Sequence, residues 1–491
     1  MKKLNLITAF LIGATILVSS CSDDFFDTAP SDDLTDSEVF SSTKNIDALI
    51  NGTIRYLMEN ATSQDNPGFG AIMLTREVMG DDAIARDGVY GFRDSYPFRD
   101  PYDNTTRRAL FFWTLQYKVI DNVNNILANT DQANGPENEK QWLKGQAYAL
   151  RAFAYLNLVQ QYQFTYSKDK NALAVPIYTE PTSPSSEGGS RATVEAVYNQ
   201  VFADLQQAEQ LLEGFNRTMK NRPNLQVVKG LLARAYLVTE QWALAAEKAR
   251  EAREGFPLMS AQQYIAGFND VSNVEWIWGH PQRAEQNLGG ASFFAYIDVT
   301  PVSGYRSIMP DPYFWQLFDD ADIRKSLFEF EDDPTHPIYR WLKYKKFINK
   351  PDRSGHIPLM RASEQALIEA ESEARLGHIP EALDALNALR VNRNLPELTA
   401  ADFSPDALIE EILLERRREL WGEGFRLTDI LRLQRAVERK ESTLTYSVNG
   451  EDLPIKGHYI RVFPDNSAFV PNSPYYLFPI PINEWNNNPN L

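Results

Sequence analysis

Apolar residues recur three and four positions apart over long stretches of the chain, and this spacing restricts the fold more than any other feature. It is present in residues 41–58, 110–127, 137–161 and 193–212. The pattern is typical of amphipathic helices, which bury one face against a neighbouring element. Thr193 stands where the last of these helices would begin, and threonine is a frequent helix N-cap. We therefore expect a mainly α-helical protein with long helices in these ranges.

Two further stretches combine small and large apolar residues in the spacing of tetratricopeptide repeats. In residues 225–257, alanines such as Ala245 and Ala249 stand where two antiparallel helices would come closest together. Residues 367–394 repeat this arrangement less completely, with Ala382 at a corresponding position. Together with the longer helices, they predict a scaffold of tetratricopeptide-like helix pairs. The alternative is a set of generic helix pairs that builds no superhelix.

The long segments between the predicted helices have no helical spacing. Residues 60–108 and 258–358 mix aromatic residues with proline, glycine, asparagine and arginine, and residues 443–491 have a similar character. Short strand-like runs such as 458–463 interrupt the last segment. We expect long aromatic-rich loop insertions on the helical scaffold, and functional residues concentrate in loops of this kind.

The N-terminus has the three parts of an export signal. Two lysines precede the apolar residues 4–18, and Cys21 follows two serines. The apolar run is too short for a membrane-spanning helix, which takes roughly 20 residues, and its layout is that of a secretory signal peptide. Because Val-Ser-Ser-Cys resembles a bacterial lipobox, we expect a lipoprotein signal peptide over 1–20, lipidation of Cys21, including palmitate, and a tether over 21–35. The alternative is a chance cysteine in an ordinary signal peptide.

Composition narrows the classes of partner and chemistry. Cys21 is the only cysteine, so the fold contains no intramolecular disulfide. The net charge of −17 would repel nucleic-acid phosphates, so we expect no nucleic-acid partner. The five histidines are not spaced as paired metal ligands on one helix, and the chain has no phosphate-binding loop and no G-x-S-x-G motif. We expect no cofactor, no metal site and no catalytic centre.

Two charged helical stretches invite functional interpretations. Glu369, Glu371 and Glu373 are a possible source of paired carboxylates, but a glycosidase needs two carboxylates that flank one bond. We interpret them as part of a solvent-exposed helix face. Residues 415–419 alternate in charge and are interpreted as structural, anchoring the C-terminal loops; the alternative is a network of intrahelical ion pairs.

Several short sequences, in the same order along the chain, are similar to those of one protein family. They are residues 24–30, 150–158, 193–198, 415–426 and 477–481. These residues resemble the SusD/RagB family of Bacteroidetes outer-membrane nutrient-binding lipoproteins, and the similarity covers nearly the whole chain. The resemblance implies a SusD-like fold with an N-terminal helical region over 36–257 and a C-terminal region over 258–491.

The resemblance also implies a location and a role. Members lie at the cell surface, anchored in the outer membrane through a lipid, which would be carried here by Cys21. They cover a SusC-type TonB-dependent barrel as a lid and capture glycans, or peptides in some members, without being enzymes. The alternatives are a peptide-binding member, a surface lipoprotein that hydrolyses glycans, and a tetratricopeptide adaptor that binds only proteins.

The aromatic loops supply the candidate ligand-binding residues. Sugars stack one face on aromatic rings, which bury a large area at low entropic cost, while their hydroxyl groups need polar partners such as arginine. The predicted ligand-binding residues are Arg86, Tyr90, Phe92, Arg93, Tyr96, Tyr296, Tyr305 and Arg306. The alternative for any one of these rings is that it fills the underside of a long loop.

Overall fold

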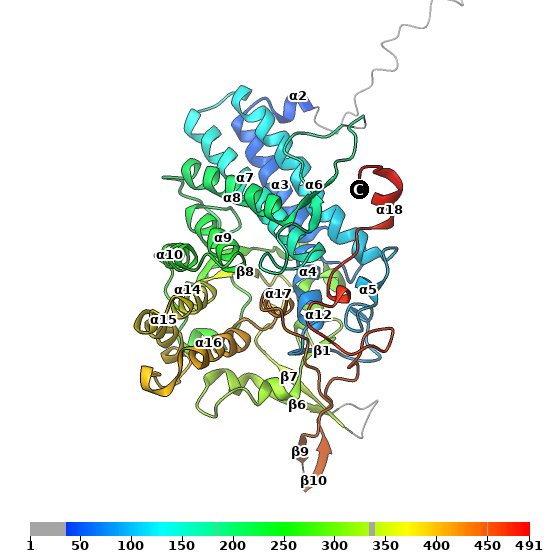
Figure 1. The fold of residues 1–491 in the computed structure, drawn as a ribbon, viewed down its shortest axis with the longest axis vertical. Helices are drawn as coiled ribbons and strands as arrows, with labels where there is room; N and C mark the ends of the chain where they lie inside the picture. The colour runs from blue at the N-terminus through cyan, green and yellow to red at the C-terminus, as the bar shows by residue number, and fades with distance from the viewer. Residues whose placement is uncertain (1–35, 184, 333–338, 449) are drawn as a thin grey trace, which may run out of the picture.

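The computed structural model describes residues 36–491 except 184, 333–338 and 449. The predicted signal peptide (1–20), Cys21 and the tether (21–35) therefore lie outside the described residues. In the part of the chain that is described, none of the helices is both long and apolar enough to cross a bilayer. Helices form most of the regular structure, as predicted (Figure 1).

The long helices of the N-terminal half lie close to the predicted ranges. They are α3 (Thr43–Glu59), α6 (Arg107–Asn129), α7 (Glu137–Tyr162) and α8 (Val194–Leu211). Thr193 is the N-cap of α8, because its side chain accepts a hydrogen bond from the backbone N–H of Ala196. Helix α7 packs between α6 and α8, so its sides are covered by neighbours along most of its length.

The predicted helix pairs are also present. The first pair is α9 (Leu225–Val238) and α10 (Trp242–Ala252), and the second is α14 (Ala362–Leu376) and α15 (Ile379–Val391), followed by α16 (Pro405–Leu420). Helix α14 packs directly on α10 although residues 253–361 separate them in sequence. Seven helices thus form one continuous stack along one side of the molecule: α7, α8, α9, α10, α14, α15 and α16 (Figure 1).

Small residues lie where the stacked helices approach each other, as the repeat pattern predicted. Ala245, Ala249, Ala370 and Ala382 are all fully buried. The main apolar core includes residues of both the N-terminal and the C-terminal regions, and a second, smaller core lies among α14, α15 and α16. The division at residues 257 and 258 stays a prediction.

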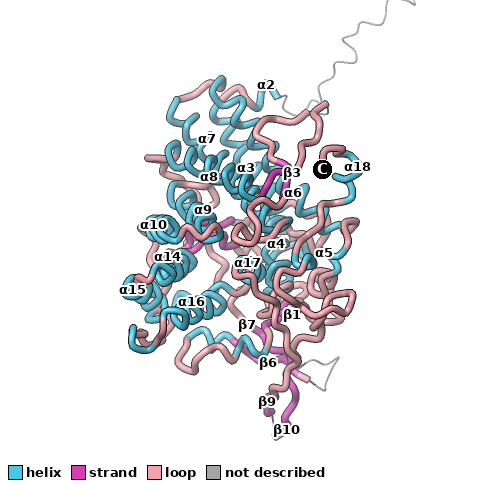
Figure 2. Tube along the Cα trace, viewed as in Figure 1, coloured by secondary structure: helices cyan, strands magenta, loops and turns pink. Residues whose placement is uncertain are grey.

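Part of each long insertion lies on the side of the molecule opposite α10, α14 and α15, where loops predominate (Figure 2). They meet through an antiparallel pair of strands, β1 (Ala83–Ala85) and β5 (Ile308–Pro310), with Ile84 opposite Met309. The short helices α5 (Arg99–Tyr102) and α12 (Phe293–Ile297) belong to the same two insertions. This pairing brings residues 60–108 and 258–358 side by side.

The expectation of loop throughout residues 60–108 is wrong, because α4 (Gly68–Val78) lies within them. Every residue of α4 is buried, so it has no polar face from which a helical period could be recognised. Gly70 also weakens the helical signal, but a β-carbon there would lie 3.2 Å from Cβ of Phe293. A larger residue there would press on Phe293, so glycine favours the close packing of α4 against α12.

The remaining elements are short. The strands form antiparallel pairs: β2 (Leu173–Pro176) with β3 (Arg191–Thr193), β4 (Trp276–His280) with β8 (Ile357–Arg361), β6 (Phe328–Asp332) with β7 (Arg340–Tyr344), and β9 (Thr445–Val448) with β10 (Glu451–Pro454). The other helices are α2 (Asp36–Val39), α11 (Ala261–Ile265), α13 (Pro312–Trp315), α17 (Arg426–Arg432) and α18 (Ile482–Asn487). The predicted strand-like run 458–463 is wrong, since only an isolated bridge from Val462 to Ala468 forms there.

The interpretation of Glu369, Glu371 and Glu373 as a solvent-exposed face is also wrong. All three are buried, because α14 is enclosed by α10, α15 and α16. Each carboxylate has a cationic partner on another element. Arg250 and Arg253 bind Glu369, Arg250 also binds Glu373, and Arg432 binds Glu371.

The charged run 415–419 is structural, but its ion pairs are mostly not intrahelical. Arg418 does bind Glu415 one turn away, at 2.8 Å. In contrast, Arg416 binds Asp429 of α17, and Arg417 binds Asp82 of the loop after α4. The run therefore fastens α16 to other parts of the fold.

Candidate functional site

Two half-buried tyrosines, one from each insertion, meet at the surface beside the β1–β5 strands. The rings of Tyr90 and Tyr305 have centroids 5.0 Å apart and are inclined at 44°. Below them, Tyr296 is fully buried and stacks on Tyr305 at 5.2 Å with an angle of 13°. We call Tyr90 and Tyr305 the tyrosine pair. Its rings are held from beneath, so their orientation is fixed by core packing.

Polar groups surround the tyrosine pair. Tyr305 Oη donates to Oε1 of the exposed Gln64 at 2.5 Å, and Tyr90 Oη donates to Asp65 Oδ1 at 3.3 Å. Asp65 is buried and pairs with both Arg107 (2.8 Å) and Arg108 (3.1 Å). The side chain of Arg107 is 60% exposed, so a ligand can approach it from solvent. The site thus combines two rings, an amide and a guanidinium.

Three of the predicted ligand-binding residues lie in the core instead. Phe92, Tyr96 and Tyr296 are at most 1% exposed. Phe92 packs edge-on against Tyr296 at 5.2 Å, and Tyr96 Oη shares a hydrogen bond with His458 Nδ1 at 2.9 Å. Burial raises the pKa of Tyr96 to about 12. These rings support the loops from beneath, so a surface ligand does not reach them in this conformation.

The three predicted arginines have different surroundings. Arg86 and Arg306 both face Glu331 of β6, at 3.7 and 3.5 Å. The side chain of Arg306, next to Tyr305 in sequence, is 35% exposed, whereas that of Arg86 is 11% exposed. Arg93 is exposed and donates through Nε to the backbone carbonyl of Val89 at 2.7 Å. Arg93 and Arg306 therefore keep donors available to a ligand near the tyrosine pair.

Sequence reasoning missed Gln64, Asp65 and Arg107. They lie at the loop before α4 and at the start of α6, next to residues that carry no aromatic signal. The sequence did contain one signal for this site, the glycine at position 91. In the structure its φ is +104°, which suits glycine, and a β-carbon there would come within 2.4 Å of Tyr296. Gly91, next to Tyr90 in sequence, thus marks the place where the backbone of this loop approaches the buried ring of Tyr296.

The carboxylate nearest to the tyrosine pair is not free for acid–base chemistry. Asp65 already accepts hydrogen bonds from Tyr90, Arg107 and Arg108. Within the described residues, no group of three or more histidine, aspartate, glutamate or cysteine side chains is arranged to hold a metal ion.

Comparison with known proteins gives the family context. Residues 24–237 match a family described as "Starch-binding associating with outer membrane", and residues 329–491 match the SusD family. A crystal structure of a SusD-like carbohydrate binding protein from Bacteroides vulgatus is similar over 92% of this chain and 97% of its own, with 38% identity and a TM-score of 0.86.

Two more distant relatives are similar to this chain over most of its length. SusD-like protein P2 of Formosa agariphila is 26% identical over 89% of this chain and 93% of its own length. A SusD superfamily protein of Bacteroides thetaiotaomicron shares the fold with a TM-score of 0.76 over 91% of this chain, at 23% identity. The relative with 38% identity is matched over almost its entire length, and the two matched family regions cover both halves of the chain. The chain therefore belongs to the SusD/RagB family of nutrient-binding proteins.

Proposed function

We propose that this protein binds glycans at the cell surface and acts as the lid of a SusC-type TonB-dependent outer-membrane transporter in nutrient uptake. The observation that carries the glycan assignment is the tyrosine pair, whose half-buried rings are fixed from below by Tyr296. The C–H face of a sugar packs on such rings, and its hydroxyl groups bind the donors of Arg107 and the amide of Gln64. Membership of the SusD/RagB family supports the transporter as partner.

The proposed ligand contacts are Tyr90, Tyr305, Arg107 and Arg306, with Arg93 at the edge. The relative from Bacteroides vulgatus is described as carbohydrate binding, which favours a glycan over a peptide. Hydrolysis is disfavoured because Asp65 is held by two arginines and is not positioned as a free acid or base. The protein is thus proposed to be a binding protein and not an enzyme.

Calorimetry of the soluble body, residues 22–491, against a panel of polysaccharides and peptides tests the ligand class. We expect at least one glycan to bind, and Tyr305→Ala to weaken it about tenfold, since an aromatic stacking contact contributes about 1–1.5 kcal/mol. Tyr102→Ala is the matched control, because Tyr102 is 52% exposed but packs on Tyr475 instead. Binding of peptides alone would replace the glycan proposal, and silence across the whole panel would refute it.

The anchor and the partner are tested separately. Cys21 is proposed to carry the lipid that holds the protein in the outer membrane, close to its transporter, where tethering raises the effective concentration of the lid. Cys21→Ala in the full-length protein should abolish surface retention, whereas residues 22–491, which lack Cys21, should still bind the glycan. Purification of the native protein from membranes should recover a TonB-dependent barrel. Normal surface levels of Cys21→Ala would contradict the lipid anchor.

A further inference from the structure

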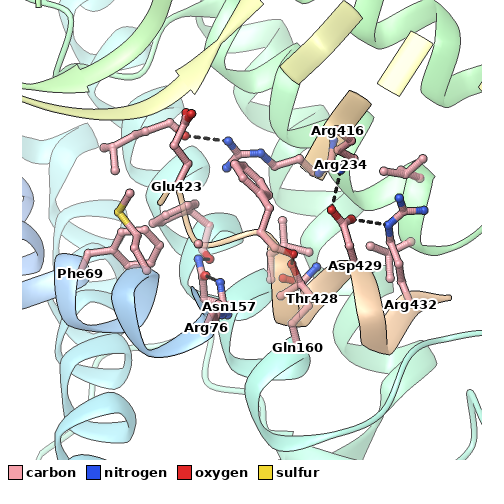
Figure 3. A pocket seen from close by; sticks show the side chains of 18 residues that line it. Phe69, Arg76, Asn157, Gln160, Arg234, Arg416, Glu423, Thr428, Asp429 and Arg432 are labelled. Atoms are coloured by element: carbon pink, nitrogen blue, oxygen red, sulfur yellow. Dashed lines mark hydrogen bonds and ion pairs between the residues drawn. The ribbon is translucent and has the colours of Figure 1, made fainter. Parts of the chain in front are cut away.

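A cavity that shares no residue with the tyrosine pair lies between α4, α7, α9 and α17 (Figure 3). It has about 60 Å³ of space for the centres of water-sized molecules, which is room for a few waters or one small ion. A smaller hollow adjoins it and shares Gln160, Val238, Thr428 and Arg432 with it. The wall is unusual because four arginines line it: Arg76, Arg234, Arg416 and Arg432.

Three of these arginines have carboxylate partners. Arg234 binds Glu364 at 2.6 Å. Arg416 and Arg432 share Asp429, each at 2.7 Å, as Figure 3 shows. Arg432 also binds Glu371 at 2.7 Å. The other carboxylate in the wall, Glu423, is taken by Lys346 and Arg361 outside the cavity.

Arg76 has no such partner. Arg76 is only 7% exposed, and it donates hydrogen bonds to two neutral amides, Asn157 Oδ1 at 3.0 Å and Gln161 Oε1 at 3.3 Å. No carboxylate of the described residues forms an ion pair with it. Burial, followed by the charge of Arg234, lowers the pKa of Arg76 to about 9. An uncompensated buried charge is costly, which is why buried charges are normally paired.

Arg416 adds an unused donor to the same wall. Its Nε donates to Asp429 at 2.7 Å, but its Nη1 is buried and has no hydrogen-bond partner. The guanidinium groups of Arg416 and Arg234 both lie over the ring of Phe425, at 5.0 and 5.2 Å from its centroid. This ring holds the two cations in the wall. The four guanidiniums are therefore matched by only three carboxylates, and one positive charge is left without a counter-ion.

We propose that this cavity binds a small oxyanion, such as phosphate, sulfate or the carboxylate of a small acid. Arg76 supplies the charge that the anion neutralises, and Arg416 supplies a hydrogen-bond donor through Nη1. The size of the cavity excludes a sugar ring and favours a compact ion. The site joins α4 to the segment before α17, because Glu77, adjacent to Arg76, accepts hydrogen bonds from the backbone of Gly424 and Phe425. The bound anion thus stabilises the contact between the N-terminal and C-terminal regions.

The test measures thermal unfolding of the soluble body, residues 22–491, as phosphate, sulfate or acetate is added at constant ionic strength. We expect a saturable rise in Tm of about 2–5 °C with one of these anions, because a ligand that binds only the folded state stabilises it. The anion that saturates at the lowest concentration identifies the source, inorganic or carboxylate.

Arg76→Met provides the discriminating variant. It removes the uncompensated charge, so it should be at least as stable as the wild type in anion-poor buffer and should lose the anion-dependent rise. Arg93→Met, which removes an exposed arginine, is the matched control and should keep the full rise. An equal rise in the wild type and in Arg76→Met, or no rise with any anion, would overturn the proposal.

A crystal grown with selenate gives a readout that does not depend on the variant's folding. The anomalous signal of selenium should lie in the cavity beside Arg76 and Arg416. Absence of selenium from the cavity, in crystals grown at a concentration that saturates any rise in Tm, would equally refute the site.

Discussion

Two groups of charged side chains differ in their exposure to solvent. One lies beside the tyrosine pair at the surface, and the other is a buried ionic cluster. The cluster contains Arg324, Arg361 and Arg393, which surround Glu275 and Glu419, and all of these side chains are fully buried. Arg361 alone binds Glu275 at 2.5 Å, Glu419 at 3.0 Å and Glu423 at 2.7 Å. Its strong donors are thus used inside the protein, and it has nothing left to offer a ligand.

Beside the tyrosine pair, one arginine is not fully used by contacts inside the protein. Asp65 is shared by Arg107 and Arg108, but the side chain of Arg108 is only 3% exposed and already holds the carboxylate from within. Arg107 is consequently free to exchange part of its bonding for a ligand. The comparison shows that an arginine is available to a ligand only when some of its N–H donors are not used in hydrogen bonds within the protein. Its presence in a charged stretch of sequence does not decide this.

Among the substitutions considered, Arg361→Met should cause the largest loss in the free energy of unfolding. It leaves Glu275, Glu419 and Glu423 short of a counter-ion in a site without water access, and breaking a buried ion pair costs about 3–5 kcal/mol. Chemical denaturation should show this loss in the free energy of unfolding. Arg107→Met is the matched control and should cost less than about 1 kcal/mol in stability, the range of exposed ion pairs. Equal losses in the two variants would remove the distinction between the cluster and the surface.

Glu77 sharpens the comparison because it is a buried carboxylate without a cation bound to it. Its Oε1 accepts hydrogen bonds from Gly424 and Phe425, while its Oε2 has no partner. Burial raises its pKa to about 7, whereas Arg393 and Arg361 hold the pKa of the equally buried Glu419 well below its usual range against the effect of burial.

Glu77→Gln should therefore change the pH dependence of stability. The folded wild type keeps a proton on Glu77 up to about pH 7, but the unfolded chain loses it near pH 4.3. The folded state binds more protons between these values, so this group lowers stability as pH rises through the interval. Glutamine should remove that loss and be more stable than the wild type by about 3–4 kcal/mol at pH 8 and by about 1 kcal/mol at pH 5. Urea denaturation at both pH values measures it, and a difference that does not depend on pH would show that Glu77 is not titrating.

Arg107→Met, harmless to stability, should act on binding. An exposed hydrogen bond to a ligand hydroxyl contributes about 1–1.5 kcal/mol, so the affinity for the glycan should fall about fivefold to tenfold. Calorimetry with the best glycan of the panel measures the change, and Arg99→Met, another exposed arginine of the same insertion, is the control. An unchanged affinity would exclude Arg107 from the site.

The helical scaffold was predictable because its helices present one apolar face, and the spacing of that face is visible in sequence. The N-cap Thr193 and the buried Ala245 and Ala382 were found in this way. Helix α4 and the charges of α14 were not, since elements enclosed on every side follow no two-faced pattern. Glu371 is as completely buried as Ala370, and its carboxylate is paired with the distant Arg432 as well as with Arg375 one turn away.

The site was predictable only in part, for a related reason. Sequence locates aromatic residues in the two insertions but does not say which side of a loop each ring takes. Tyr90 and Phe92 are two positions apart, yet one reaches the surface and the other lies beneath Arg108, whose guanidinium is 4.7 Å from the ring centroid. Arg107 differs from Arg108 by one position on α6, and that rotation alone separates the exposed donor from the buried one.

Tyr305→Phe should have the smallest effect on stability and glycan affinity. It distinguishes the contribution of the aromatic ring from that of its hydroxyl group. The substitution keeps the stacking on Tyr296 and removes the hydrogen bond to Gln64. Because Gln64 is exposed, water replaces the lost donor, and we expect at most about 0.5–1 kcal/mol in stability and a similar, twofold to fivefold, loss of glycan affinity. Calorimetry and denaturation of Tyr305→Phe beside Tyr305→Ala measure both. If the phenylalanine variant bound as weakly as the alanine variant, the hydroxyl group would carry the interaction. The tyrosine pair would then resemble the ionic cluster, in which polar contacts and not ring faces provide the binding energy.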